Sequence, residues 1–332
     1  MNRLQNYKDE NIAYWTKRAP GYSDVNREEL RTAQRKIWSQ ALDTRIRLHF
    51  EGRSRNNIHV LDVGTGPGFF AIILTELGYR VTAVDYTSAK LERARRNAGR
   101  LAEKICFQQM NAEELSFPDG SFDVIVSRNL TWNLSKPEQA YAQWVRVLKQ
   151  GGLLLNFDAN WYRYLYDAQA ETGHHSDREN VRAAGAADDT AGTDVAAMEA
   201  IARQAPLSRC RRPQWDQDIL GRLGMKVSAD TEVWKQVWTR DEWINNASTP
   251  MFLITASRTP SGGATLKKYV FRRLLQLIPI LLIITFLSFG VMRLAGSDAV
   301  LQKMENTGMV VSQETIDAAR AELGLCLLYT SD

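Results

Sequence analysis

Short apolar runs recur along residues 59–157, and stretches of helical character separate them. The run at 59–63 suits a central strand of a parallel sheet, and residues 69–77 are predicted to form the helix behind it. Strands that alternate with helices in this way predict a parallel sheet. The predicted strands are 59–63, 81–85, 105–109, 122–126 and 153–157, followed by 225–231 and 251–258. A helix is predicted at 137–148, with Gly151-Gly152 as its stop signal.

Three alternate glycines, Gly64, Gly66 and Gly68, follow the first strand and precede the first helix. Glycines let a backbone turn tightly against a ligand, but nicotinamide-binding loops have the spacing G-x-G-x-x-G, whereas this loop has G-x-G-x-G. Asp62 lies two residues before the loop, where a carboxylate would repel a pyrophosphate. The pattern therefore favours a cofactor with a cationic amino group, and an ordinary tight turn remains the alternative.

Polar residues also follow the other predicted strands. Asp85 ends the second strand, where its carboxylate can accept hydrogen bonds from two ribose hydroxyls. Asn111-Ala112 follows the third strand and Asn129 the fourth. Asp158 and Asn160 follow the fifth strand, at the edge where open parallel sheets bind ligands. These positions predict a nucleoside site beside a second ligand.

Together these residues resemble the class I S-adenosylmethionine-dependent methyltransferases, in the branch that includes the ubiquinone and menaquinone biosynthesis enzymes. The resemblance covers about residues 14–258. It implies an α/β fold, a Rossmann-like seven-stranded sheet that is mostly parallel, with helices on both faces and an antiparallel last strand. It implies S-adenosyl-L-methionine as cofactor and a small-molecule methyl acceptor. The implied cofactor-binding residues are Tyr22, Asp62, Gly64, Thr65, Gly66, Gly68, Asp85, Tyr86, Asn111, Ala112 and Asn129.

Within this resemblance, the glycine loop and Asp62 hold the methionine part, Asp85 the ribose and Asn111-Ala112 the adenine. The family usually has Asp where this chain has Asn111, and an amide oxygen can accept the same hydrogen bond. Asn129 matches the position that faces the methyl group.

Residues 11–22 resemble the W-x-x-x-A-x-x-Y lid that precedes the core in this branch. Aromatic rings at Trp15 and Tyr22 would exclude water and attract the sulfonium to their faces. Plain helix packing is the alternative reading of these aromatic residues, and of Tyr14.

The expected reaction is an in-line displacement of the methyl group, in which orientation and water exclusion supply much of the catalysis. Asp158 is the candidate base for a protonated nucleophile, and Asn129 and Asn160 are candidates for positioning the acceptor. Residues 161–223 are predicted to form a substrate cap, in which a guanidinium fork suits a carboxylate. The candidate substrate contacts are Tyr14, Trp132, Trp161, Arg211, Arg212 and Trp215.

The composition restricts the partners. The 332 residues carry a formal net charge of +4, and the basic clusters at 209–212 and 267–273 lack the aromatic interleaving of a nucleic-acid groove, so nucleic acid is not expected. Three widely separated cysteines do not predict disulfides. His174-His175 has no further ligand at metal-site spacing, so we expect no metal.

Beyond residue 258 the chain changes character. Residues 274–292 carry no charge until Arg293 and are long enough for a C-terminal transmembrane helix, and the basic flank before them predicts a cytoplasmic catalytic domain attached to the inner membrane. Residues 269–299 resemble the first helix of the permeases of peptide and nickel ABC importers, which suggests two neighbouring genes read as one. The predicted parts are a helical lid 1–50, the methyltransferase domain 51–258, a linker 259–266, the permease-like fragment 267–325 and a sequencing-adapter artefact 326–332.

Two alternatives remain open from the sequence. One is a genuine membrane-anchored methyltransferase of a lipophilic substrate, and the other is a dinucleotide-dependent oxidoreductase. A transport component is supported by the tail alone.

Overall fold

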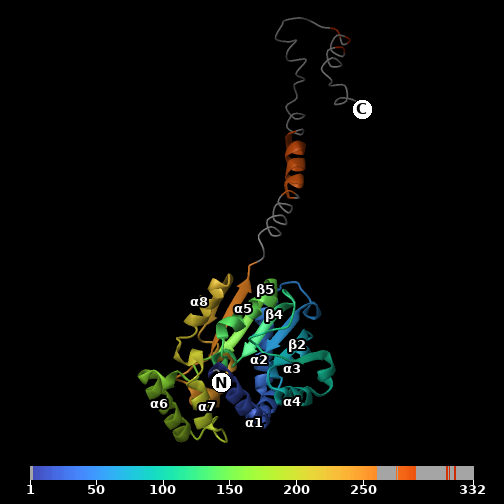
Figure 1. Ribbon diagram of the computed structural model, residues 1–332. Coiled ribbons are helices and arrows are strands. Elements are labelled where there is room, and N and C mark those ends of the chain that lie inside the picture. The colour runs from blue at the N-terminus through green and yellow to red at the C-terminus, as the bar shows by residue number, and fades with distance from the viewer. Residues whose placement is uncertain are drawn as a thin grey trace. The chain divides into compact units, whose positions relative to one another are not determined.

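The computed structural model describes residues 3–259, 274, 276–288, 312, 314 and 318. The chain divides into two compact units, Met1–Ser261 and Gly262–Asp332. All the helices and strands named below belong to the first unit, which is the lower body in Figure 1.

A seven-stranded sheet forms the centre of the first unit, in the order β3-β2-β1-β4-β5-β7-β6 (Figure 1). The pairs from β3 to β5 are parallel, whereas β7 is antiparallel to both β5 and β6. The predicted seven-stranded, mostly parallel sheet is thus confirmed. The strands are β1 His59–Val63, β2 Arg80–Asp85, β3 Ile105–Gln109, β4 Phe122–Arg128, β5 Leu148–Asp158, β6 Met225–Asp230 and β7 Phe252–Arg258.

Helices cover both faces of the sheet because apolar side chains alternate between its faces. Val60 packs in one core with Trp38, while its neighbour Leu61 packs in the other core with Trp144. Figure 1 shows α2 and α3 on one side of the strands and α5 and α8 on the other. The helices that build these two cores are α2 Ala33–His49, α3 Phe69–Glu76, α4 Ser88–Ala98, α5 Pro137–Val147 and α8 Gln214–Arg222.

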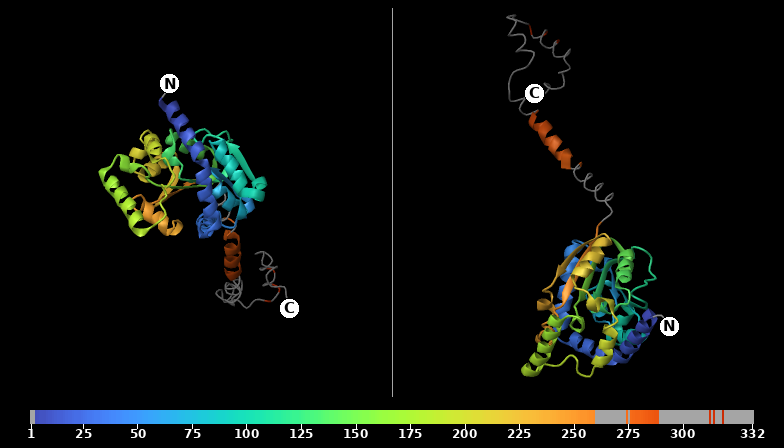
Figure 2. Two further views of the ribbon diagram at one scale, coloured as in Figure 1. Left: turned by 90° about the horizontal axis from the view of Figure 1, so that it is seen from below. Right: turned by 60° about the vertical axis from the view of Figure 1, so that its left-hand side comes forward.

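The first fifty residues form two helices with different roles. The second of them, α2, buries Trp38, Leu42 and Ile46 completely in the core, so it is part of the helical layer of the domain. The first, α1 Arg3–Arg31, crosses the end of the domain between α4 and the cap helices, as the left view of Figure 2 shows. The predicted lid is therefore structurally α1 alone.

The end of α5 differs from the prediction. The helix stops at Val147, and β5 begins directly at Leu148. The predicted stop signal at Gly151-Gly152 lies inside β5, where the pairing with β4 shifts register. A Cβ at Gly152 would lie 2.7 Å from the Leu148 side chain, so glycine lets Leu148 fold back into the core beside this irregularity.

The cap between β5 and β6 is helical. One small core joins the cap to α1, where Met198 and Ile201 pack with Tyr7 and Trp132. Two short helices between β6 and β7 complete this side, and one of them, α10, contacts α6. The remaining helices are α6 Ala168–Ala184, α7 Val195–Ala202, α9 Trp234–Val237 and α10 Arg240–Asn246, with 3-10 segments at Arg55–Asn57, Gly99–Lys104, Thr131–Asn133, Arg163–Leu165 and Pro206–Arg209.

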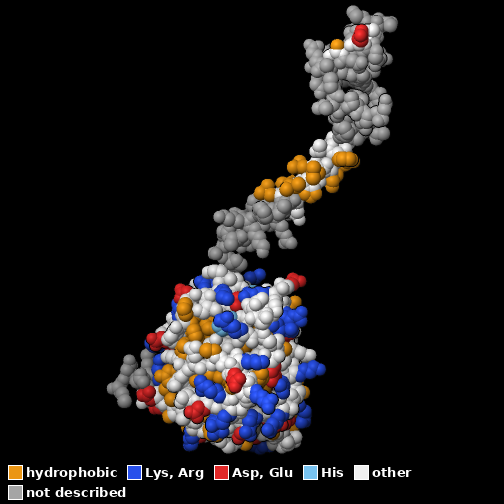
Figure 3. All heavy atoms as spheres, turned by 90° about the vertical axis from the view of Figure 1, so that its right-hand side faces the viewer, with side chains coloured by type: hydrophobic (Ala, Val, Ile, Leu, Met, Phe, Trp, Pro, Cys, Tyr) orange, Lys and Arg blue, Asp and Glu red, His pale blue; other side chains and the backbone are white. Residues whose placement is uncertain are grey.

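Basic side chains gather on the face of the first unit seen in Figure 3, the side on which α3 and α4 lie. The last turn of α4 carries exposed Arg95 and Arg96, and exposed Arg100 lies in the 3-10 segment that follows.

The predicted transmembrane segment 274–292 is only partly described. Residues 276–288 are helical, and every side chain among them is exposed. In the parts of the chain given above, no helix has both the length and the apolar character needed to cross a bilayer. The rest of the permease-like fragment, apart from single residues, and the whole of 326–332 lie outside the described residues.

Candidate active site

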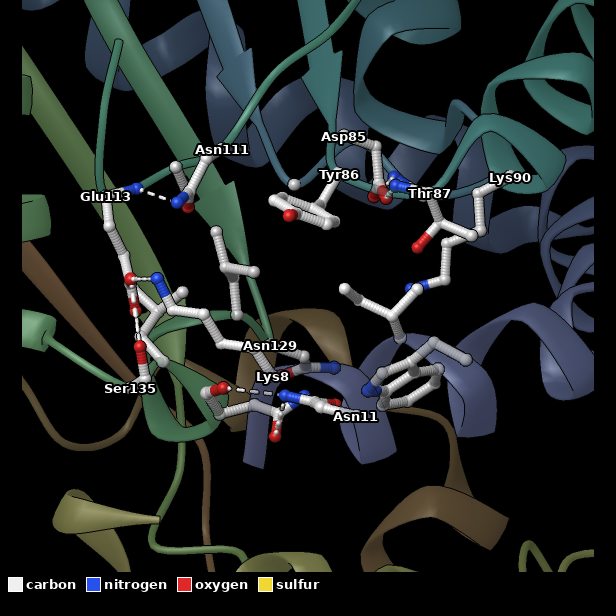
Figure 4. A pocket seen from close by; sticks show the side chains of 18 of the residues that line it. Lys8, Asn11, Asp85, Tyr86, Thr87, Lys90, Asn111, Glu113, Asn129 and Ser135 are labelled. Carbon is white, nitrogen blue, oxygen red and sulfur yellow. Dashed lines mark hydrogen bonds and ion pairs between the residues drawn. The ribbon is translucent and has the colours of Figure 1, made fainter. Parts of the chain in front are cut away.

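A cavity opens where β1, β2 and β4 end, beneath α1. We call it the loop cavity, because Gly64, Gly66 and Asp85 form its floor. Eight of the eleven predicted cofactor-binding residues line it: Tyr22, Gly64, Gly66, Asp85, Tyr86, Asn111, Ala112 and Asn129. Figure 4 shows residues of α1 along one side of the cavity and two ends formed by different strands, with Asp85, Thr87 and Lys90 at one end and Asn111, Glu113 and Ser135 at the other.

The backbone of the glycine loop lies close to β2 and to α4. The amides of Gly64 and Thr65 both donate to the carbonyl oxygen of Val84, at 2.8 and 3.0 Å, which holds the loop against β2. A Cβ at Gly68 would lie 3.0 Å from Ala94, and φ there is 94°. Gly68 thus serves the packing of α3 against α4, and neither Gly68 nor Thr65 lines the loop cavity.

Asp85 connects the loop to the end of β2. One carboxylate oxygen accepts from the Gly66 amide at 3.0 Å and the other from the Thr87 amide at 2.9 Å. The side chain is buried yet lines the loop cavity. Each oxygen keeps a second lone pair, so the carboxylate is held in place and can still accept from a ligand.

Asp62 lies behind the loop and does not line the cavity. It is 2% exposed and accepts a hydrogen bond from the Thr65 hydroxyl at 2.6 Å. Burial raises the pKa of Asp62 to about 7, and the charge of Asp85 adds to the rise. The predicted direct contact with the amino group of a cofactor is therefore not supported, and Asp62 can act on the site through its charge and through the loop.

Asn111 uses its side-chain oxygen within the protein. This oxygen accepts from the Glu113 amide at 2.9 Å, which closes a tight turn at the end of β3. If Asn111 also accepts a hydrogen bond from adenine, as predicted, it uses the second lone pair of this oxygen. The alternative is that the Asn111 amide nitrogen faces the ligand and donates to it.

A clamp of three side chains holds α1 over the loop cavity. Lys8 forms an ion pair with buried Glu113 at 2.9 Å (Figure 4), and Tyr7 donates from its hydroxyl to the Asn133 carbonyl oxygen at 3.0 Å. Asn11 exchanges hydrogen bonds with the Asn133 side chain at 3.1 and 2.9 Å. Sequence reasoning missed these residues because the partners lie more than a hundred positions apart and no local motif marks them.

The clamp carboxylate, Glu113, also accepts from the Ser135 hydroxyl at 2.7 Å and from the Lys136 amide at 2.8 Å. Burial by itself raises the pKa of Glu113, but the hydrogen bonds from Lys8, Ser135 and Lys136 outweigh it and hold this pKa below its usual range. The carboxylate is therefore charged at neutral pH and keeps its attraction for Lys8.

Lys90 was also missed. Its ammonium lies 4.1 Å from the centroid of the Trp15 ring and 5.9 Å from that of Tyr22. Burial lowers the pKa of Lys90, while the charge of Asp85 opposes this effect. The two lid rings thus present a face to which a cation is attracted.

Asn129 holds an unusual backbone conformation at the end of β4. Its φ of 54° lies in the left-handed region, which Asn tolerates better than most residues. The Asn129 amide donates to the Phe157 carbonyl oxygen at 2.8 Å, which fixes the turn. Its side-chain oxygen is buried and has no hydrogen-bond partner within the protein. A buried acceptor without a partner indicates a place for a ligand donor.

A second and larger cavity, which we call the cap cavity, has a volume of about 960 Å³ and lies between α1, the turn after β4 and the cap helices. Its wall combines aromatic rings with charged side chains, five carboxylates and three guanidiniums among the described residues, and such a mixed lining suits a small molecule. The predicted substrate contacts Tyr14, Trp132 and Trp161 line it, as do Tyr162 and Tyr164. Trp15, Tyr22 and Asn129 line both cavities, so the two meet at these three residues.

Asp158 does not have the environment of a general base. It is fully buried, forms an ion pair with Arg212 at 2.8 Å and accepts from the Trp132 amide at 3.0 Å. Arg212 pairs on its other side with buried Asp216 at 2.7 Å. Asn160 exchanges two hydrogen bonds with the Arg212 backbone, at 2.8 and 3.1 Å. Asp158, Asn160, Arg212 and Asp216 line neither the loop cavity nor the cap cavity. Their bonds therefore fasten the cap to the end of β5.

Two further predicted substrate contacts lie elsewhere. Arg211 is exposed, and Trp215 stacks on Tyr141 with ring centroids 6.0 Å apart. Both lie outside the linings of the loop and cap cavities. Within the described residues, no three His, Cys, Asp or Glu side chains converge as a metal ion requires.

The sequence around the loop cavity is similar to that of known proteins. Residues 61–156 match the family model described as Methyltransferase domain. The uncharacterized methyltransferase YcgJ of Bacillus subtilis is 38% identical over 100 residues, which are 30% of this chain and 40% of the relative. Demethylmenaquinone methyltransferase of Deinococcus radiodurans is 34% identical over 139 residues, 41% of this chain and 55% of the relative. The chain therefore spans about half the length, or less, of these curated relatives.

The crystal structure of the YcgJ protein aligns with 68% of this chain and 99% of its own, at 21% identity and a TM-score of 0.44. The family match runs from β1 to β5, the strands whose ends surround the loop cavity. Residues 61–156 thus match a methyltransferase domain, and the relatives that align with this region are named as methyltransferases.

Proposed function

We propose that the chain transfers the methyl group of S-adenosylmethionine to a small-molecule acceptor by in-line displacement. The cofactor occupies the loop cavity and the acceptor occupies the cap cavity. The observation that carries this proposal is the junction of the two cavities at Trp15, Tyr22 and Asn129. A transferred group has to pass between two ligands in contact, and adjoining cavities allow that contact.

In the loop cavity, Asp85 accepts from the ribose hydroxyls, and the backbone around Gly64 and Gly66 approaches the methionine part. The hydrogen bonds that already hold Asp85 support this role, because they fix its carboxylate before the ligand arrives. The sulfonium lies against Trp15 and Tyr22, in place of the Lys90 ammonium that these rings now attract.

Catalysis rests on orientation and exclusion of water. The lid helix α1 covers the loop cavity, and Asn129 directs its free oxygen to the acceptor. Since Asp158 is fully buried in ion pairs, proton removal by that carboxylate has no part in the proposal.

Isothermal titration of the full chain with S-adenosylmethionine, S-adenosylhomocysteine and NADH tests the proposal. Binding of the two adenosyl compounds without NADH would support it. Binding of NADH alone would instead favour the dinucleotide-dependent oxidoreductase, which remains the alternative.

The residues beyond the methyltransferase domain are the subject of a separate proposal. We propose that 267–292 is the start of a permease-like segment behind the methyltransferase, and the uniformly exposed apolar side chains of 276–288 support an environment other than the domain core. Genomic reads across 260–268 test whether one gene or two encode the chain. A single uninterrupted frame would favour a membrane-anchored enzyme.

A further inference from the structure

We infer that Lys90 makes the loop cavity distinguish S-adenosylmethionine, whose sulfur is a cation, from S-adenosylhomocysteine, whose sulfur is neutral, and that it weakens binding of the first relative to the second. This inference rests on the proposed function and adds a specificity-determining residue to that same site. Three observations carry it: the contact of the Lys90 ammonium with the lid rings, the pairing of the other cations around the loop cavity, and the position of Lys90 in the first turn of α4.

The first observation is the place of the Lys90 ammonium. Its nitrogen lies 4.1 Å from the centroid of the Trp15 ring and 5.9 Å from that of Tyr22. Figure 4 shows the Lys90 side chain extending from the Asp85 end of the loop cavity toward α1. The proposed function places the sulfonium against the same two rings. Two cations repel each other and share the attraction of one aromatic face, so the sulfonium has to displace the ammonium or bind beside it at a cost.

The second observation concerns the other cations of the loop cavity. Lys8 pairs with Glu113 at 2.9 Å, and Arg128 pairs with Glu29 at 2.6 Å. Of the described residues that line this cavity, Lys90 is the one cation without an ion pair. The charges of Lys8 and Arg128 are compensated by their partners, whereas a ligand in the cavity meets the charge of Lys90.

Two further charged groups lie near the lid rings. Burial lowers the pKa of Lys90 and the charge of Asp85 opposes this effect, but both Asp85 oxygens already accept from backbone amides. Arg18 also has no ion pair in the described part of the chain, but it lines the cap cavity and not the loop cavity. Lys90 is therefore the cation that a sulfonium in the loop cavity has to oppose.

The third observation is the unfavourable position of Lys90 in its helix. Because α4 begins at Ser88, Lys90 lies in the first turn, where the helix carries partial positive charge and acidic side chains are favoured. This turn contains no acidic residue. Residues that depart from a local preference are expected at functional sites, and Lys90 is such a residue.

The methyl transfer changes the charge that Lys90 meets. As the carbon–sulfur bond breaks, its electron pair stays on sulfur, and the methyl carbon forms its new bond to the nucleophile of the acceptor. The sulfur of the product is neutral, so the Lys90 ammonium can lie on the Trp15 face while the product is bound. Lys90 thus raises the affinity of the product relative to that of the cofactor.

Titration calorimetry of the full chain with three ligands tests the inference. S-adenosylmethionine has a sulfonium, sinefungin has an ammonium-bearing carbon in its place, and S-adenosylhomocysteine has a neutral thioether. We expect Lys90→Met to increase the affinity for both cationic ligands about tenfold relative to that for S-adenosylhomocysteine, because the competing cation is gone. The parallel change for sinefungin would show that the effect follows charge and not the methyl group.

Two control variants accompany Lys90→Met. Lys90→Arg keeps the positive charge and should leave the ratio of the affinities unchanged. Lys17→Met removes an exposed lysine of α1 that lines neither the loop cavity nor the cap cavity, and it should also leave this ratio unchanged. If Lys90→Met changes the affinity for all three ligands equally, or for none of them, the inference is overturned.

A second variant tests whether the indole ring is the shared contact. In a Trp15→Leu background, Lys90→Met should change the affinity ratio less than about threefold, because neither cation then has the Trp15 face. A full tenfold change in that background would overturn the contact with Trp15 as the cause. A wild-type chain that binds none of the three ligands would overturn the proposed function itself, which the same titration detects before any variant is compared.

Discussion

Two buried aspartates stand at the same edge of the sheet in opposite surroundings. Asp62 lies beside the loop cavity, on what the proposal makes the cofactor side; it is 2% exposed, and no Lys or Arg in the described part of the chain pairs with it. Asp158 lies beneath the cap, on what the proposal makes the acceptor side; it is fully buried and Arg212 neutralises it at 2.8 Å. The difference indicates that Asp62 bears the cost of burial without a counter-ion, which raises its pKa, whereas Asp158 is neutralised by an ion pair that holds the cap in place.

Removing the cation of the acceptor side, Arg212, should cause the largest loss of stability. Arg212→Ala leaves Asp158 and Asp216 buried without a counter-ion, so we expect the free energy of unfolding to fall by about 4 kcal/mol. Chemical denaturation followed by circular dichroism measures this change.

The neighbouring residue is the control for that variant. Arg211 is exposed, so Arg211→Ala should change the free energy of unfolding by less than about 0.5 kcal/mol. Equal losses in the two variants would mean that the buried ion pairs do not fasten the cap.

On the cofactor side the largest effect should fall on binding. Asp85→Ala removes the carboxylate that accepts from Gly66 and Thr87 and that, in the proposed complex, accepts from the ribose, so S-adenosylmethionine affinity should drop by about 3 kcal/mol, roughly a hundredfold. Titration calorimetry measures it, and Asp119→Ala, an exposed carboxylate paired with Arg146, is the control. Unchanged affinity would remove Asp85 from the site.

The cofactor side was also the more predictable from sequence. Its strands, its glycine loop and Asp85 follow one another within about thirty residues, so short-range patterns describe them. Even there, Gly68 and Asp62 line neither the loop cavity nor the cap cavity, because a motif records which residues recur and not which of them touch a ligand.

The acceptor side depends on contacts that sequence spacing does not encode. Asp158 was predicted as a base from its position after β5, and only the fold shows that Arg212, 54 positions later, neutralises it. The same limit hid the clamp between Lys8 and Glu113. Long-range pairing of charges follows from tertiary packing, which periodicity along one strand or helix does not reveal.

The dependence of stability on pH gives a further test of the contrast between Asp62 and Asp158. Burial raises the pKa of Asp62 to about 7 in the folded chain, against 3.8 as the ordinary value. Above pH 7 the Asp62 carboxyl is ionised in both the folded and the unfolded chain, and the folded state bears the cost of burying the charge. At low pH the carboxyl is neutral and this cost is absent. The stability that Asp62 contributes at low pH is therefore lost as the pH rises from about 4 to 7. Asp62→Asn should therefore raise the free energy of unfolding by about 2 kcal/mol at pH 8 and by less than half of that at pH 5.

Denaturant titrations at the two pH values measure this gain. The amide oxygen of the variant can still accept from the Thr65 hydroxyl, so the loop keeps that contact. A gain that does not depend on pH would contradict a buried, unneutralised carboxylate at this position.

The smallest effect should come from the clamp between Lys8 and Glu113. This ion pair on the cofactor side corresponds to the buried pair of Arg212 and Asp158 on the acceptor side. Lys8 is partly exposed and only Glu113 is buried, so water compensates much of the loss that Lys8→Met causes. We expect about 1 kcal/mol, seen as a roughly fivefold faster dissociation of S-adenosylmethionine in stopped-flow measurements, because α1 opens more readily. Lys17→Met, an exposed lysine on the same helix, should leave the rate unchanged. If both variants behave alike, α1 is held over the loop cavity by apolar packing, and the cofactor side needs no charge pair to close.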